Sequence, residues 1–330
     1  MTKTQMIDEI NRIRKEQKVT IVAHFYQKDD VFELADLNGD SLQLAKMAMD
    51  DENPNLVFCG VGFMGESVKI LAPQKRVFMP KLASCAMARM IDGKHFDTAV
   101  ALLEKEGIKK EDILPITYIN SSAVVKAKVG KMGGMVCTSS NAKKIIDKGL
   151  TSGKKILFVP DKCLGQNIAH INGLKSCVIG DGSDPKDADI ICYNGFCSVH
   201  QLFSVEDIEF YRNKYPGIKI VTHPECPPEV CKLSDFAGST SQIIKYIAEL
   251  PLEQKVAVGT EFNLVNRLRK ENTYVLSSTK PECSTMNETS VEDLYNCLKA
   301  LEQGKPINEV FLDEDTSHYA KLALERMFEV

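Results

Sequence analysis

The feature that most constrains how this chain can fold is an internal repeat. Three similar segments begin at positions 56, 156 and 256, so each begins 100 residues after the one before it. Their sequences are LVFCGVGFMG, ILFVPDKCLG and VAVGTEFNLV, and in each a short apolar strand leads into a helix. Equal spacing argues against chance similarity between apolar runs, so we interpret the chain as three copies of one structural unit.

The stretches around these segments repeat as well. A strand that ends in a polar cluster precedes each one, at 21–27, 116–122 and 220–226. A serine-led helix follows that strand, beginning near Ser41, Ser139 and Ser239. A third strand closes each copy and runs on to a cysteine, at Cys85, Cys197 and Cys283. Each copy is therefore β-α-β-α-β, which is typical of a parallel sheet with right-handed crossovers.

From this pattern we predict an α/β fold of three similar three-layer αβα domains with parallel sheets, related by a pseudo-threefold axis. The predicted domains are 18–105, 106–212 and 213–289. Charged segments at 102–112 and 204–217 separate them. Helices within 1–17 and 290–330 are expected to pack on the outside.

Composition excludes several classes of protein. The net charge of -4 gives no basic excess for nucleic-acid binding. No apolar run approaches the roughly 18 residues that span a bilayer, and the amphipathic N-terminus lacks the apolar core of a signal peptide. We therefore expect a cytoplasmic protein. The eleven cysteines would then serve metal binding, catalysis or packing instead of disulfides.

The three repeated cysteines suggest a metal site. Strand ends of parallel sheets are where sites form, so Cys85, Cys197 and Cys283 would meet at the centre of three domains. Three thiolates suit zinc or an iron–sulfur cluster. A 4Fe-4S cluster needs four ligands, so three cysteines would leave one iron open to act as a Lewis acid. The alternatives are that these are ordinary buried cysteines, or that zinc uses the closely spaced pairs Cys226–Cys231 or Cys192–Cys197.

One short stretch combines an acid–base pair with an anion site. The strand 220–222 stops at His223-Pro224-Glu225-Cys226, because proline cannot continue a central strand. His223 and Glu225 can exchange protons near neutral pH, and repulsion from a nearby cluster and from the carboxylates of a bound substrate is expected to raise the Glu225 pKa. Ser239 and Thr240 open the next helix, where free amides favour a phosphate or carboxylate. Serines at such positions also serve simply as helix caps.

With these residues assembled, the chain resembles the quinolinate synthase family from about residue 18 onward. The resemblance rests on many ordered motifs: AHFYQ, GDSLQLA, CGVGFMGES, TYINSSAVVKA, CTSSNA, PDKCLG, NGFCSVH, THPEC, FAGSTSQ, GTE and PECSTMN. It implies three α/β domains around a 4Fe-4S cluster held by Cys85, Cys197 and Cys283. It also implies condensation of iminoaspartate with dihydroxyacetone phosphate to quinolinate, with loss of phosphate and two waters, in the biosynthesis of NAD. An enzyme that supplies iminoaspartate is the expected partner.

The resemblance implies a role for particular side chains. Catalysis would involve Tyr26, Tyr118, His223 and Glu225. Substrate binding would involve His24, Ser41, Tyr118, Asn120, Ser139, His223, Glu225, Ser239 and Thr240. The extra cysteines that some relatives carry beside the third ligand are missing here, where the sequence reads Cys283-Ser284-Thr285-Met286.

Several points stay open at the level of sequence. His200 either orients Cys197 or simply packs. Glu261 and Asn263 follow a strand, and the sequence gives them no clear role. Three lysines could hold phosphate: Lys69, Lys126 and Lys162. An iron–sulfur hydro-lyase acting on a small hydroxy acid is a rival reading, although such a substrate needs no phosphate site. An iron–sulfur carrier or sensor is another, although it has no need of His223, Glu225 and Tyr26.

Overall fold

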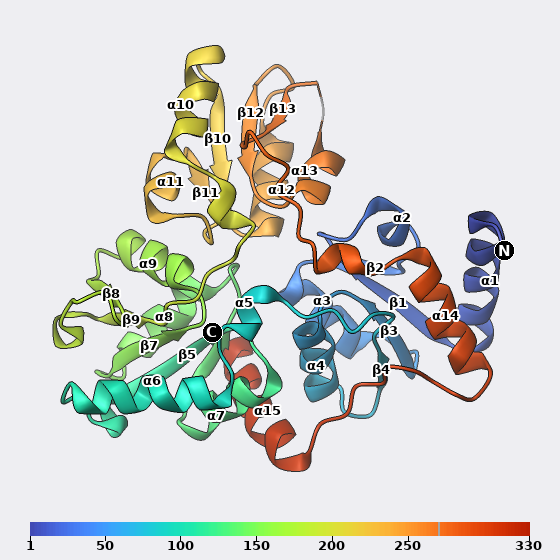
Figure 1. Cartoon of the computed structure of the whole chain (residues 1–330), viewed down its shortest axis with the longest axis horizontal. Coiled ribbons are helices and arrows are strands. Elements are labelled where there is room, and N and C mark those ends of the chain that lie inside the picture. The colour runs from blue at the N-terminus through green and yellow to red at the C-terminus, as the bar shows by residue number, and fades with distance from the viewer. Residues whose placement is uncertain (270) are drawn as a thin grey trace.

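The computed structural model describes residues 1–269 and 271–330 and contains three parallel sheets, one in each copy of the repeat. Figure 1 shows the sheets, with their helices, set around a common centre. Their strand orders are β2-β1-β3-β4, β6-β5-β7-β9-β8 and β11-β10-β12-β13. The α/β fold with three similar layered units, predicted from the sequence, is therefore confirmed.

The first unit lies N-terminal in the chain. Its elements are β1 (Val19–His24), α2 (Asp29–Phe32), β2 (Leu37–Gly39), α3 (Ser41–Asp50), β3 (Asn55–Cys59), α4 (Gly62–Leu71), β4 (Arg76–Phe78), α5 (Ala86–Arg89) and α6 (Gly93–Lys105). All six residues of β1 are buried, as expected of a central strand covered on both faces.

The second unit repeats this order with one insertion. Its elements are η1 (Lys110–Asp112), β5 (Ile113–Tyr118), α7 (Ala123–Lys131), β6 (Met135–Cys137), α8 (Ala142–Leu150), β7 (Lys155–Val159), α9 (Lys162–Ile171), β8 (Ser176–Val178), η2 (Pro185–Asp187), β9 (Ile190–Cys192) and η3 (His200–Leu202). The inserted strand is β8, which lies at the edge of the sheet beyond β9.

The third unit has the same strand order as the first. Its elements are α10 (Val205–Lys214), β10 (Lys219–Thr222), α11 (Pro228–Leu233), β11 (Phe236–Ala237), α12 (Thr240–Glu249), β12 (Val256–Gly259), α13 (Phe262–Leu268), β13 (Thr273–Val275) and η4 (Met286–Glu288). The charged segment expected between units two and three is thus largely the helix α10, which packs on α11 of the third unit.

Strand pairing is equivalent in the three units. Ile21 pairs with Val57, Ile116 with Phe158, and Val221 with Val258 at the centre of the three sheets. These are the strands that the hundred-residue repeat predicts, and their carboxyl ends lead into the polar clusters. The short strands β2, β6 and β11 were not predicted, because two or three residues at a sheet edge leave little pattern in a sequence.

The terminal helices pack in two different places. Helix α1 (Lys3–Glu16) packs against α14 (Val291–Glu302), beside the first unit (Figure 1). Helix α15 (Glu314–Phe328) instead contacts α7 and α4, bridging units two and one. It comes so close that a Cβ atom at Gly130 would lie 1.9 Å from the Tyr319 carbonyl oxygen. Within the described chain, the structure contains no helix with an apolar stretch long enough to cross a bilayer.

The apolar cores distinguish the third unit from the other two. One continuous core includes Val22 and Phe58 of the first unit together with Ile116 and Phe158 of the second. The third unit has separate cores on the two faces of its sheet. Met286 and the partly buried Cys283 of this unit join the shared core, and polar contacts made by Asp40, Asn167 and Arg267 also connect it to the other two units.

Candidate active site

The same hydrogen bond holds the loop before each repeated cysteine. The backbone N–H of the first residue of α4, α9 or α13 donates to the carbonyl two residues before the cysteine. These bonds run from Gly62 to Ala83, from Lys162 to Gly195 and from Phe262 to Pro281, at 2.8, 2.9 and 2.9 Å. The first amides of a helix have no partner within it, so each unit uses one of them to fix its cysteine loop.

The three sulfur atoms share a second backbone contact. Burial raises the pKa of all three thiols, that of Cys85 to about 12. The N–H group three residues further on opposes this by donating to the sulfur, from Ala88, His200 and Met286 respectively. Because N–H···S contacts tune iron–sulfur clusters and metal binding requires thiolates, this donor set fits a cluster with one cysteine from each unit.

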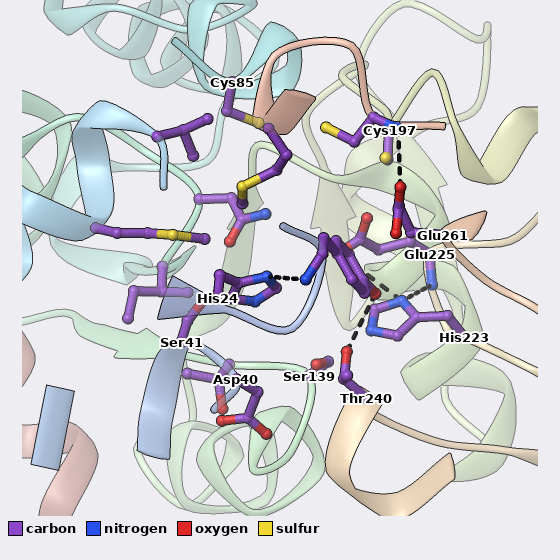
Figure 2. A pocket seen from close by; sticks show the side chains of 18 of the residues that line it. His24, Asp40, Ser41, Cys85, Ser139, Cys197, His223, Glu225, Thr240 and Glu261 are labelled. Carbon is purple, nitrogen blue, oxygen red and sulfur yellow. Dashed lines mark hydrogen bonds and ion pairs between the residues drawn. The ribbon is translucent and has the colours of Figure 1, made fainter. Parts of the chain in front are cut away.

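All three cysteines line one cavity where the units meet, and Figure 2 labels Cys85 and Cys197 in its wall. Its empty space, including the part open to solvent, is about 680 Å³. The lining also includes the predicted residues His24, Tyr26, Ser41, Tyr118, Asn120, Ser139, His223, Glu225 and Thr240. The structure thus brings together twelve of the thirteen residues predicted from the sequence, without testing their roles.

Glu225 lies at the centre of a polar network in this cavity. Its Oε1 atom accepts a hydrogen bond from the Tyr118 phenol at 2.5 Å, and its Oε2 atom lies 3.0 Å from His200 Nδ1. His223 Nδ1 lies 3.8 Å from Oε1, and the two imidazole rings stack with their centroids 4.6 Å apart. Burial acts to raise the Glu225 pKa, but the two imidazoles and the Tyr118 hydrogen bond outweigh it. The surrounding protein groups therefore lower this pKa, and the rise expected near a cluster and substrate carboxylates stays a prediction.

The phenol of Tyr26 reaches across from the first unit to the third. Its Oη atom lies 3.1 Å from Thr240 Oγ1 and 3.0 Å from Thr260 Oγ1. Burial and the nearby Glu225 carboxylate raise the Tyr26 pKa well above its ordinary value. The phenol therefore keeps its proton and is available as a hydrogen-bond donor.

Two histidines of the cavity are neutral. Burial lowers the pKa of His24 to about 4 and that of His223 to about 3. The Nδ1 atom of His24 accepts the Tyr26 amide at 3.1 Å, and that of His223 accepts the Glu225 amide at 3.3 Å. A neutral imidazole that accepts at Nδ1 carries its proton on Nε2, so both rings offer a donor at Nε2.

Of the three helix starts at the cavity, that of α12 is capped by its serine as the sequence suggested, whereas α3 and α8 are capped by Asp40 and Asn141. Asp40 caps α3, so Ser41 is the first helical residue and lines the cavity. Ser239 caps α12, is fully buried, and among the described residues is the predicted site residue that lies outside the lining. Both Ser239 and Thr240 were expected at the anion site, but of these two residues it is Thr240 that lines the cavity. Ser139 lines the cavity and is within hydrogen-bonding reach of Tyr118.

Sequence reasoning missed Asp40, which joins the three units. Its Oδ1 atom accepts the amide of Gln43, while its Oδ2 atom accepts the hydroxyls of Ser241 at 2.7 Å and Ser140 at 3.3 Å. Figure 2 shows the carboxylate beside Ser41, on the side of the cavity where Ser139 and Thr240 also lie. The signal was present, because Asp40 with Gln43 three residues later is a capping-box pattern.

The residues whose roles the sequence left undecided make different contacts in the structure. His200 does more than pack, since it pairs with Glu225 and its Nε2 atom lies 3.2 Å from Thr260 Oγ1. Glu261 lines the cavity and accepts the Cys283 amide at 3.3 Å, and burial raises its pKa to about 8. The three candidate lysines bind other groups: Lys69 the carbonyls of Pro73 and Lys75, Lys126 those of Ile119 and Ser121, and Lys162 the side chain of Asn194.

One other group of side chains in the described structure could hold a metal ion. All eleven cysteines carry free thiols, and Cys192 is fully buried in β9. Ligand atoms of Cys197, His200 and Glu225 lie within 4.8 Å of one another, a set that suits a single zinc ion. However, only Cys197 of this set has the backbone contacts that recur in all three units, whereas His200 and Glu225 already pair with each other.

Comparison with known proteins agrees with this arrangement. The family model described as quinolinate synthetase A protein matches residues 8–329. The chain belongs to the quinolinate synthetase A family. The resemblance seen in its motifs is therefore confirmed over nearly the whole chain.

Curated relatives of this quinolinate synthetase A family member share its length. A protein named quinolinate synthase from Helicobacter pylori (strain HPAG1) is 57% identical over 316 residues, which cover 94% of each chain. Another of that name from Helicobacter pylori (strain ATCC 700392 / 26695) is 54% identical and covers 97% of each. One from Streptomyces coelicolor is 39% identical, covering 94% of this chain and 84% of its own.

Proposed function

We propose that this chain is a quinolinate synthase that condenses iminoaspartate with dihydroxyacetone phosphate, releasing phosphate and two waters. The observation that carries the proposal is the single cavity where one cysteine from each unit faces the network of Tyr26, Tyr118, His223 and Glu225. Family membership and the shared name of its relatives support the same activity. The product would enter the biosynthesis of NAD.

The cysteine triad would hold the cofactor. We infer that Cys85, Cys197 and Cys283 bind a 4Fe-4S cluster, which when bound supplies a Lewis acid through the one iron that these residues leave without a ligand. The repeated N–H···S contacts support this, because they favour the thiolate form that ligation needs.

The acid–base work would fall to the residues opposite the triad. Condensation and two dehydrations require groups that take up and deliver protons at carbon, nitrogen and oxygen. Glu225 has a lowered pKa, so it is ionised and can accept a proton from the substrate. The Tyr118 phenol, 2.5 Å from its Oε1 atom, can supply a proton to the substrate in exchange. His223 is neutral with its proton on Nε2, and the Tyr26 phenol keeps its proton, so both can donate hydrogen bonds. The buried position of His223 keeps bulk water from competing for these contacts.

The anionic groups of the substrates would bind at the helix starts. Ser41, Ser139 and Thr240 each lie at or just before the first turn of a helix, where free amides and hydroxyls favour carboxylate and phosphate. Asn120 and His24 would add neutral donors to the substrate oxygens. Asp40 would repel an anion placed against it, so it limits where the phosphate can bind.

The proposal extends to cellular context. Eleven free thiols fit a reducing compartment, and we infer a cytoplasmic enzyme on that ground. Its partner would be an oxidase or dehydrogenase that supplies the imine of aspartate.

The test is anaerobic purification, followed by measurement of iron, sulfide and the absorption spectrum, and then an assay for quinolinate with both substrates. We expect about four irons per chain and product only when both substrates are present. Dehydration of a small hydroxy acid without quinolinate would support the hydro-lyase instead. A bound cluster without turnover of either kind would support a carrier or sensor.

A further inference from the structure

The loop that carries Tyr26 leaves three successive backbone carbonyls without backbone partners. Residues 25–28 follow β1 and form neither helix nor strand. Among the described residues, no backbone N–H donates to the carbonyl oxygens of Phe25, Tyr26 or Gln27. Unpaired carbonyls in a partly buried loop are unfavourable, so these groups need partners from elsewhere.

Helix α13 of the third unit supplies those partners from one of its faces. Arg267 donates through Nη2 to the Phe25 carbonyl and through Nη1 to the Gln27 carbonyl, the latter at 2.9 Å. Asn263, one turn earlier on the same helix, donates through Nδ2 to the carbonyl of Tyr26 at 3.1 Å. Positions four residues apart lie on the same side of a helix, so one short surface binds all three carbonyls in register.

The Arg267 guanidinium is itself held firmly. Its Nη1 atom lies 2.7 Å from Asp29 Oδ1, and its Cζ atom lies 4.1 Å from the centroid of the Phe32 ring. Its side chain is only 18% exposed. A planar guanidinium with fixed partners can bridge two carbonyls, which the single ammonium group of lysine cannot do with the same geometry.

We propose that Arg267, assisted by Asn263, is a positioning residue for Tyr26: it fixes the loop of the first unit against the third so that the phenol meets Thr240 and Thr260. This inference rests on the proposed function only in so far as Tyr26 takes part in turnover. The hydroxyls that receive the phenol belong to the third unit, and so do Arg267 and Asn263. The same unit therefore places both the loop and the partners of its side chain.

The test compares Arg267→Met with Arg269→Met, which removes a guanidinium two residues further on, where it is exposed and packs near Phe262 outside the central cavity. Single-turnover formation of quinolinate is measured in both variants, and in each of them combined with Tyr26→Phe. Arg267→Met should slow product formation about 100-fold, as expected for a misplaced catalytic group. In the Tyr26→Phe background it should cost less than about twofold, because the group it positions is already gone. Arg269→Met should have no effect in either background.

A second measurement does not depend on activity. Hydrogen exchange at the amides of residues 25–29 should become faster in Arg267→Met and stay unchanged in Arg269→Met, with iron content equal in both. Unchanged exchange in Arg267→Met, or an equal loss of rate with and without the Tyr26 hydroxyl, would overturn the proposal. If the wild type makes no quinolinate while the exchange changes as described, the proposed function fails and the positioning role stands.

Discussion

Single side chains in the cavity differ sharply in charge, and their surroundings explain the difference. Glu225 accepts a hydrogen bond from the Tyr118 phenol and lies beside two imidazoles. Its pKa therefore falls, even though burial acts to raise it. Glu261 is also buried but has mainly backbone amides as partners, and its pKa rises to about 8. The sequence motif identifies Glu225 as a candidate. It cannot give the sign of the shift, because His200 and Tyr118 come from distant parts of the chain.

Glu225→Gln tests the acid–base role at this scale. The substitution keeps the shape and a hydrogen-bond acceptor but removes the charge that can take up a proton. We expect the cluster spectrum to remain and turnover to fall by about 100-fold or more. Glu229→Gln on the exposed side of α11 is the matched control and should retain full turnover. Near wild-type rates in Glu225→Gln would remove this residue from the mechanism.

At the scale of helices and strands, the repeat predicts the long central strands well and the edges poorly. Strands β1, β5 and β10 were recognisable because nearly all of their residues are buried and most of them are apolar. Strand β8 and the short strands β2, β6 and β11 depend on pairing with a neighbour that the sequence does not reveal. Helix starts were placed correctly to within a residue or two, yet which residue caps the helix and which lines the cavity was decided by packing, as Asp40 and Ser41 show.

Ser239→Ala separates capping from ligand binding. Ser239 caps α12 in a reciprocal pair with Gln242 and lies outside the cavity lining. Its loss should lower the free energy of unfolding by about 1 kcal/mol, measured by urea titration, with no change in the KM for either substrate. The companion variant Thr240→Val keeps the volume of the side chain but removes a partner of the Tyr26 hydroxyl, so it should impair turnover. A raised KM in Ser239→Ala would show that the serine contacts substrate after all.

At the scale of the whole molecule, three repeats create a site that none of them contains alone. Each unit contributes one cysteine, held by the same pair of backbone contacts, and the candidate acid–base residues Tyr26, Tyr118 and Glu225 come from all three units. The equal spacing in the sequence was enough to predict this convergence. It could not predict that units one and two share a continuous apolar core while the third keeps its own. That asymmetry depends on which faces of the units pack together, and such packing produces no periodic pattern in the sequence.

The asymmetry of the cores leads to a prediction about stability. Most of the buried apolar residues of the third unit lie in its own two cores, and polar contacts such as those of Arg267 and Asp40 link it to the others, so without metal it should unfold separately and first. A cluster bound to cysteines of all three units would stabilise only the assembled state and couple the units together. Anaerobic calorimetry should therefore show two transitions in the apoprotein and one, at higher temperature, in the loaded protein.

Cys283→Ala should retain two transitions under loading conditions. Cys297→Ala, which changes a buried cysteine of α14, should behave as the wild type does. One transition in both apoprotein and Cys283→Ala would mean that packing, not the cluster, unites the three units.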